Sequence, residues 1–196
     1  MFNPTIELAD KMPGRRVIKS HLPLEFLPPD LLKTCKVIYV ARTPQDTMVS
    51  YYHHNLLLEW HGYKGTFGQF LRYFQDGILP YGSYWYHLRT GYEARDHPNL
   101  KFLWFEDMKR EQRKVIRELS TFLEVSLTED QLADLDDHVK FENMKKNSMA
   151  NPCGKEGFFR KGIVGDWRNW FSAEQAEETE KWIRESVRGT QLENAL

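Results

Sequence analysis

The sequence has few cysteines and no long apolar segment. Its two cysteines, Cys35 and Cys153, lie far apart and form no C-x-x-C pair, which argues against a disulfide framework or a zinc knuckle and favours a reduced, cytoplasmic protein. No apolar run approaches the roughly 20 residues that a membrane span needs. The first ten residues, MFNPTIELAD, lack the apolar core of a signal peptide. We therefore expect a cytoplasmic protein with no membrane partner.

An excess of charge of one sign is also absent. The 27 Lys and Arg residues nearly balance the 28 Asp and Glu residues, which leaves a formal net charge of −1. No global field then attracts nucleic acid, so any anion site has to be local. A length of 196 residues with 41% hydrophobic content indicates one globular domain spanning residues 1–196.

Several common functional motifs are missing. The sequence contains no G-x-x-x-x-G-K-[ST], G-x-G-x-x-G or G-x-S-x-G, so Walker-type nucleotidases, Rossmann dehydrogenases and α/β-hydrolases lose their main support. His53, His54 and His61 are close in sequence, but no Asp, Glu or Cys completes a recognisable ligand set. We expect no metal.

Three short apolar stretches are present and predict strands at 16–20, 36–41 and 101–105. The second is apolar nearly throughout, as in a strand buried on both faces of a parallel sheet. Helical patterns separate and follow these stretches. One helix is predicted to begin at Thr43-Pro44, and capping boxes are predicted for Thr128 with Gln131 and Ser172 with Gln175. The alternation favours an α/β fold with a three-layer arrangement, a parallel sheet flanked by helices, and a site beyond the carboxyl ends of the strands.

Arg42 leaves the second strand where a helix begins, and free backbone N–H groups at such a point favour an anion. Ser50 follows eight positions later, roughly 12 Å along a helix axis, so both side chains could meet one phosphate. The competing interpretation pairs Arg42 with Asp46 and leaves Ser50 to pack. Spacing alone does not decide between them.

Lys19 and His21 follow the first predicted strand with one residue between them, so both project from one face of an extended segment. A histidine at a strand end can act as a general base, and a lysine beside it can stabilise developing negative charge. The competing interpretation is a structural histidine.

Three carboxylates, Asp46, Glu106 and Asp107, stand near predicted helix starts, where capping explains them more simply than acid–base chemistry. Near the C-terminus the stretch FFRKGIVGDWRNWF places two cations, Arg160 and Lys161, before Gly162. It is either an anion clamp on a bend or a basic surface loop held by aromatic neighbours. The irregular stretch 147–157 before it is a candidate lid or linker.

These segments match a known family in order. IKSHLP, YVARTPQDTMVSYYH, FEDMK, FENMKKN and RKGIVGDW resemble the cytosolic sulfotransferases from about residue 16 to 172. Those enzymes transfer a sulfuryl group from 3′-phosphoadenosine 5′-phosphosulfate (PAPS) to a hydroxyl or amine of a small acceptor such as a phenol, steroid, alcohol or amine. The resemblance implies a P-loop-kinase-like sulfotransferase fold, of which this chain would be the C-terminal two-thirds, truncated at the N-terminus.

The resemblance also implies roles for individual residues. His21 falls on the catalytic base and Lys19 on a lysine near the transferring group. Arg42 and Ser50 fall on the pair that binds the 3′-phosphate of the cofactor. The residues implied in closing over that phosphate or lining the adenine pocket are Phe105, Phe141, Phe159, Arg160, Lys161 and Gly162.

The chain also departs from the family pattern. Phe105 stands where the family usually has tyrosine, so one hydroxyl near the adenine is lost. The family's C-terminal dimer motif has only a loose counterpart at Arg168, Ser172-Ala173 and Glu177, which gives a homodimer weak support.

The largest departure concerns the phosphosulfate-binding loop, of the type Y-P-K-S-G-T-T-W, which has no counterpart before His21 in these residues. In the family, the strand that carries this loop is internal to the sheet, so its neighbours would expose apolar edges. We expect very low or no transferase activity from the chain as written. The alternative function is a non-catalytic module that binds a 3′-phosphoadenosine nucleotide or a partner.

Overall fold

The computed structural model describes residues 9–151, 154 and 156–196, so the expectations for Cys153 and most of the N-terminal ten residues fall outside the described part. Two parallel strands form the centre: β1 (Val37–Ala41) and β2 (Leu100–Trp104) pair from Val37 with Leu100 through Ala41 with Trp104. These are the second and third predicted strands, each within one residue of its expected bounds. Phe105 opens a helix instead of ending β2.

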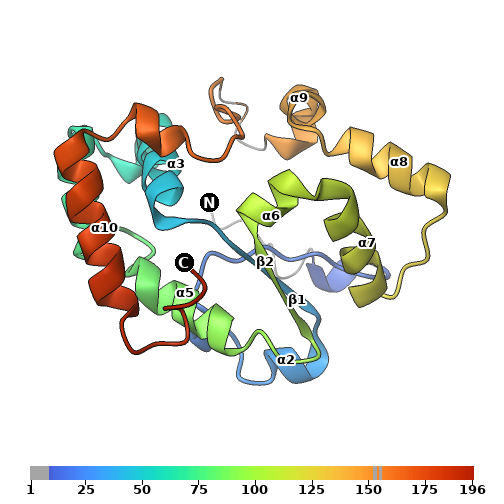
Figure 1. Cartoon of the computed structure of the whole chain (residues 1–196). Coiled ribbons are helices and arrows are strands. Elements are labelled where there is room, and N and C mark those ends of the chain that lie inside the picture. The colour runs from blue at the N-terminus through green and yellow to red at the C-terminus, as the bar shows by residue number, and fades with distance from the viewer. Residues whose placement is uncertain (1–8, 152–153, 155) are drawn as a thin grey trace.

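Helices lie on both sides of the strands (Figure 1). On one side are α3 (Pro44–Leu57), α4 (Phe67–Gln75), α5 (Tyr84–Glu93) and α10 (Ala173–Val187). On the other are α6 (Phe105–Arg110), α7 (Gln112–Phe122), α8 (Glu129–His138) and α9 (Phe141–Lys146). The short helical turns are η1 (Leu24–Phe26), α2 (Leu31–Thr34), η2 (Glu59–His61), η3 (Ser148–Ala150) and η4 (Asp166–Asn169).

Local sequence explains most helix starts. The predicted capping boxes are present: the side chain of Thr128 accepts from Gln131 N and that of Ser172 accepts from Gln175 N, with both glutamines bonding back. Thr66 and Gln69 form a third box at the start of α4. Thr43 is the N-cap of α3 with Pro44 in the first turn, but its hydroxyl makes no capping bond. The sequence therefore predicted correctly that α3 begins at Thr43-Pro44, but the hydroxyl of Thr43 does not cap this helix.

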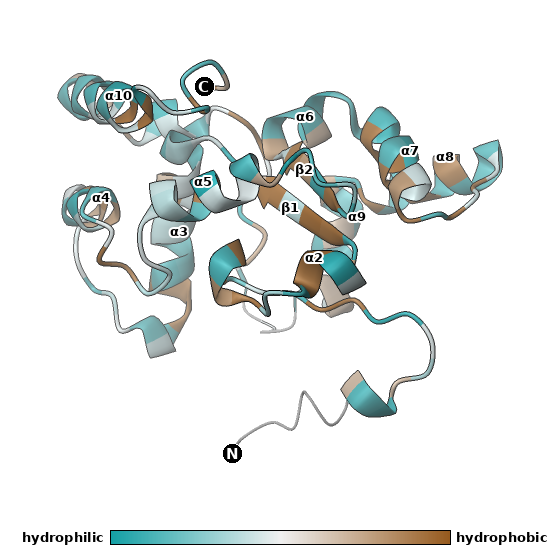
Figure 2. Ribbon diagram, turned by 90° about the horizontal axis from the view of Figure 1, so that it is seen from below, coloured by the Kyte–Doolittle hydropathy of each residue, from teal (hydrophilic) through white to brown (hydrophobic). Residues whose placement is uncertain are grey.

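The strand predicted at 16–20 is wrong. These residues form neither strand nor helix, and Val17 is 100% and Ile18 77% exposed. In Figure 2 the N-terminal part of the described chain leaves the body of the molecule. A β-branched stretch fits a strand only when a neighbouring strand offers backbone partners, and the described sheet contains β1 and β2 alone. The described residues thus form a mostly helical fold with a small parallel sheet of two strands.

The expectation that β1 is buried on both faces is also wrong. Ile38 and Val40 are 40% and 52% exposed, whereas Tyr39 and Ala41 on the opposite face are covered. An apolar run is compatible with burial on two faces but does not supply the second covering layer. The exposed apolar side chains therefore include two on β1, Ile38 and Val40, and two on residues 16–20, Val17 and Ile18.

Two buried clusters hold the carboxyl end of β1. The first joins β1, α5 and the C-terminal segment through Ala41, Trp85, Leu88, Val187 and Leu192. The second joins α3 to α4 and the segment after it through Met48, Phe70, Leu71, Phe74 and Leu79. Each fully buried aliphatic or aromatic side chain contributes about 1.5–3 kcal/mol. The β1–α3 junction, which carries Arg42, is therefore set in a packed frame.

Candidate functional site

A cavity of about 430 Å³ opens at the carboxyl end of β1, within the usual size range of ligand pockets. Its walls come from the segment around His21, the end of β1, one side of α3, and residues 81–88. His21, Arg42 and Ser50 all line it. The structure thus brings the predicted base and the predicted phosphate-binding pair to one cavity, although Arg42 and Ser50 make no direct contact with each other.

The surroundings of His21 favour the neutral form of its imidazole. Its ring stacks on Tyr81 with centroids 4.8 Å apart, and its carbonyl oxygen lies 3.3 Å from His87 Nε2. Partial desolvation at the cavity lowers the pKa of His21 from its usual 6.5, and the electrostatic effects of Lys19 and His87 lower that pKa further. The imidazole is therefore neutral at physiological pH. Lys19 itself is exposed and acts on His21 through its charge.

Arg42 links the cavity to the 160–166 loop. Its Nη2 donates to the carbonyl of Ile163 at 3.1 Å and lies 3.7 Å from Asp46 Oδ2. The guanidinium stacks over the ring of Phe105 at 4.5 Å, and Nε is buried without a hydrogen-bond partner in the described part of the chain. The pairing with Asp46, posed as an alternative to a phosphate site, is therefore present. This pairing leaves the Nε–H of Arg42 without an acceptor in the described part of the chain.

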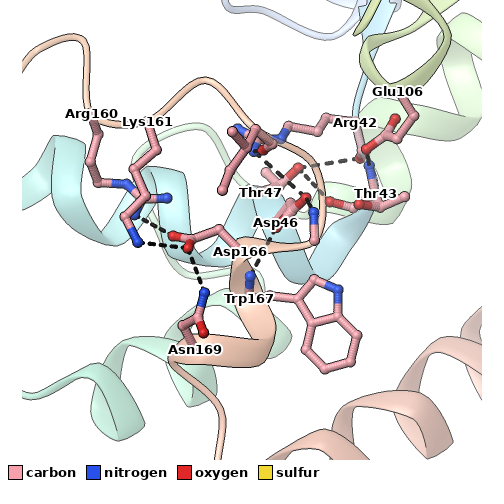
Figure 3. A network of polar contacts seen from close by, with 12 residues as sticks. Arg42, Thr43, Asp46, Thr47, Glu106, Arg160, Lys161, Asp166, Trp167 and Asn169 are labelled. Carbon is pink, nitrogen blue, oxygen red and sulfur yellow. Dashed lines mark hydrogen bonds and ion pairs between the residues drawn. The ribbon is translucent and has the colours of Figure 1, made fainter. Parts of the chain in front are cut away.

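Arg160 and Lys161 are both held by one carboxylate, Asp166 (Figure 3). Asp166 is 1% exposed, and it also accepts from Asn169 Nδ2 at 2.9 Å. Burial by itself would raise the pKa of Asp166, but hydrogen bonds from Lys161, Asn169 and Arg160 outweigh burial and hold that pKa well below its usual range. The two cations are thus oriented before any ligand is added.

Gly162 occupies a position that tolerates no side chain. Its φ is +63°, and a Cβ there would lie 2.1 Å from Cδ2 of Phe141. The Phe141 ring meets Phe159 edge-on, with centroids 6.1 Å apart. Gly162, Phe141 and Phe159 were all predicted to lie around the nucleotide. They therefore form one contiguous surface at the bend.

Asp46 and Glu106 cap elements other than their own helices. Asp46, 1% exposed, accepts from the backbone N–H of Gly165 at 2.6 Å and of Trp167 at 3.1 Å, at the start of η4. Glu106 Oε1 accepts from the N–H of Thr43 at 3.0 Å, at the start of α3. The prediction that Asp46 and Glu106 cap helices is correct, but each caps a helix other than the one in which it lies. Sequence spacing does not reveal such contacts between distant segments. Asp46 in effect ties the 160–169 loop to α3 (Figure 3).

Sequence reasoning missed three side chains around His21 and the loop. Tyr81 is exposed at the cavity and stacks on His21. His87 and Asp166 received no prediction, since neither belongs to a spacing pattern that identifies a site. Their roles depend on contacts between segments.

The structure bears on the expected lack of a metal site and of a membrane span only within the described residues. In that part of the chain, no group of three or more His, Cys, Asp or Glu side chains is arranged to hold a metal ion. The rings of His54 and His61 meet edge-on at 5.2 Å. None of the described helices combines the length and apolarity needed to cross a membrane.

Comparison with known proteins places these features in a family. The sequence-family model of the sulfotransferase domain matches residues 2–191 of this chain. Mouse (Mus musculus) sulfotransferase 1B1 is 36% identical over 198 residues, covering 96% of this chain and 66% of the relative. Mouse sulfotransferase 1A1 is 40% identical over 185 residues, covering 89% of this chain and 63% of the relative. The chain therefore spans about two thirds of the length of these relatives.

Solved structures agree. Mouse sulfotransferase SULT7A1 complexed with PAP is similar at a TM-score of 0.87 and 30% identity, over 96% of this chain and 71% of that chain. Retinol dehydratase in a complex with retinol and PAP is similar at a TM-score of 0.87 and 33% identity, over 96% and 59%. With a family model covering nearly all of its residues, the chain belongs to the cytosolic sulfotransferase family.

Proposed function

We propose that this chain binds the 3′-phosphoadenosine part of PAPS and presents a small acceptor to His21, as a sulfotransferase does. One observation carries the proposal: Arg42 lines the cavity of His21 and also hydrogen-bonds to the loop that holds Arg160 and Lys161. The base and the cations are therefore parts of one connected structure. PAPS would supply the sulfuryl group and leave as adenosine 3′,5′-bisphosphate (PAP).

The described residues fit the nucleotide in two respects. The buried Nε of Arg42 has no partner in the described chain, so a guanidinium donor is left for an anion. Gly162 has no side chain, so its backbone packs closely on Phe141 and brings the loop of Arg160 and Lys161 to one of the rings predicted to border the adenine. Arg42 and Ser50 would hold the 3′-phosphate with Arg160, Lys161 and Gly162, and the rings of Phe105, Phe141 and Phe159 would border the adenine.

The acceptor would occupy the cavity beside His21. A neutral imidazole can take the proton of an acceptor hydroxyl or amine, and such general-base assistance is worth roughly 10²–10⁴-fold in rate. Tyr81 and Tyr51, which also line the cavity, give it an aromatic wall suited to a flat apolar molecule. Solved relatives hold retinol and androsterone. Phenols, steroids, alcohols and amines are the classes proposed here.

The rate of these 196 residues by themselves should be low. They contain no Lys-Ser-Gly-Thr loop of the family type, and the loss of even one preorganised donor to a developing charge costs about 10²–10³-fold. We expect nucleotide binding with little or no turnover. The second candidate, a non-catalytic 3′-phosphoadenosine-binding module, is favoured by the same observation, since the link from Arg42 to the loop of Arg160 and Lys161 does not involve the missing Lys-Ser-Gly-Thr loop.

Calorimetry with PAP tests the binding proposal. We expect binding to wild type, at least tenfold weaker binding to Arg42→Ala and Arg160→Ala, each losing a charged hydrogen bond of about 1.5–3 kcal/mol, and unchanged binding to Arg184→Ala. Arg184 is an exposed arginine on α10, paired only with Glu180 in the described chain. Equal binding by all four folded proteins would contradict the proposal. Turnover of radiolabelled PAPS with a panel of phenols and alcohols then separates an enzyme from a binding module.

A further inference from the structure

A chain of polar contacts runs from the sheet to the segment that carries His21. Tyr39, in β1, places its Oη 2.6 Å from Nδ1 of His87, which stands in α5. The other ring nitrogen of His87, Nε2, lies 3.3 Å from the carbonyl oxygen of His21. The imidazole of His87 thus bridges the sheet and the backbone of the proposed base.

The partners of His87 decide its tautomer. A carbonyl oxygen can only accept, so Nε2 of His87 must carry the proton that faces His21. Burial lowers the pKa of His87, so the ring is neutral and Nδ1 accepts from the hydroxyl of Tyr39. The same hydroxyl also lies within donating distance of the carbonyl of His87, at 2.9 Å, and that carbonyl accepts from Thr90 Oγ1 as well, at 2.9 Å. The hydroxyl proton of Tyr39 therefore faces both Nδ1 and the carbonyl of His87, while Nε2–H of His87 faces His21.

Tyr39 is a firm anchor for this chain. Its ring stacks on Phe102 of β2 with centroids 5.2 Å apart and planes 10° from parallel. On the other side it packs so closely on α5 that a Cβ at Gly91 would lie 2.4 Å from the ring. The hydroxyl of Tyr39 therefore has little freedom to move away from His87.

The segment around His21 has few other attachments. Residues 16–20 pair with no strand, and His21 and Leu22 lie outside any helix. Its side chains contact the Tyr81–His87 region, where His21 stacks on Tyr81 and Glu25 accepts from the hydroxyl of Tyr86, and Arg15 just before it donates to the carbonyl of Leu123. The contact from His87 reaches the backbone of His21 itself.

We propose that His87, oriented by Tyr39, is a positioning residue that fixes the backbone of His21 and so keeps the imidazole of His21 against Tyr81 at the cavity. The proposal rests on the proposed function, in which His21 is the base. It assigns no chemical step to His87, which lines the cavity and acts here through the backbone of His21. It connects the orientation of the base to the sheet through two hydrogen bonds.

NMR of the full chain with isotope-labelled histidine tests the proposal without requiring turnover. In wild type we expect ¹⁵N shifts that report the Nε2–H tautomer for His87, a nuclear Overhauser contact between the rings of His21 and Tyr81, and a titration midpoint of His21 below 6.5. In His87→Leu the contact should weaken about three- to tenfold, as for the loss of one hydrogen bond, and the midpoint should rise toward 6.5. In His87→Gln, whose amide can donate in place of Nε2, both should stay near wild type.

Several outcomes would overturn the proposal: an Nδ1–H tautomer in wild type, a folded His87→Leu with unchanged ring contact and midpoint, or His87→Gln impaired as much as His87→Leu. If His87→Leu does not fold, Tyr39→Phe serves, because it keeps the ring stack on Phe102. Loss of the hydroxyl should give His87 mixed tautomers and weaken the His21–Tyr81 contact, and an unchanged His87 spectrum would refute the part of Tyr39. Binding of PAP, measured separately, is independent of these signals, so failure of the proposed function and failure of this proposal are distinguishable.

Discussion

The phosphate-binding half of the site and the segment that carries the base are held in different ways. In the first half, two carboxylates are each 1% exposed: Asp46 ties α3 to the 160–169 loop, and Asp166 holds Arg160 and Lys161 within that loop. In the second half, His21 is exposed. The segment around His21 contacts the rest of the molecule mainly through α5 and the residues just before α5. The first half is ordered by buried charge, which is costly to disturb. The second is held by a few half-buried contacts, which can be altered one at a time.

Removal of Asp46 should give the largest effect on the first half. Asp46→Ala leaves the N–H groups of Gly165 and Trp167 without their acceptor, at about 1–3 kcal/mol for each buried group. We expect the free energy of unfolding in urea to fall by about 2–4 kcal/mol. Asp134→Asn, at an exposed position in the middle of α8, should change it by less than about 0.5 kcal/mol. Equal losses in the two variants would mean that Asp46 does not join the loop to α3.

Gly162→Ala should weaken PAP binding more than it weakens the fold. A side chain here meets a left-handed φ of +63° and the ring of Phe141, which would displace the loop. Gly189→Ala is the matched control, since Gly189 has a similar φ of +71° and nothing within 4 Å of its Cβ position. Both should lose about 1 kcal/mol of stability for the backbone conformation. At least tenfold weaker binding is expected for Gly162→Ala alone, and similar calorimetric affinities would remove Phe141 and Gly162 from the proposed site.

Acid should loosen the first half through Asp166. The pKa of this carboxyl is depressed in the folded state, so its stabilisation is present above the unfolded pKa of about 3.9 and is lost as pH falls through the lower folded value. The urea midpoint of wild type should therefore decline as pH falls from about 5 to 2, and Asp166→Asn should flatten that decline. An identical pH dependence in the two proteins would show that Asp166 is not the group responsible.

The smallest effect is expected in the second half, at the segment that was predicted to be a strand. Val17→Ser and Ile18→Ser alter side chains that are 100% and 77% exposed, so each should change stability by less than about 0.5 kcal/mol. Leu88→Ala, at a position 2% exposed in the core, should cost about 2–5 kcal/mol by comparison. Urea unfolding measures all three. A loss of several kcal/mol at Val17 would show that this segment is packed and that the two halves differ less than described.

Interactions between residues close in sequence were predicted correctly, whereas interactions between distant segments were missed. The capping boxes at Thr128 and Ser172 were predictable because their partners lie three residues away. The same local reasoning failed for Asp46, whose partners lie 119 and 121 residues away. It also failed for residues 16–20, where β-branched side chains suit a strand but no strand of the described sheet pairs with them. The arrangement of Arg42, Ser50 and His21 at one cavity was expected from family motifs and not from spacing alone.

The amino-acid sequence by itself determined the helices that begin at local caps, the two central strands and the set of residues that resembles the cytosolic sulfotransferases. Those features depend on propensity and on neighbours within a few residues. Only the tertiary structure decided that Asp166 holds Arg160 and Lys161, that Asp46 joins the loop to α3, and that Tyr39 and His87 connect the sheet to His21. Hydrogen bonds between distant segments form where packing brings the groups together, and no local pattern encodes which pairs will meet.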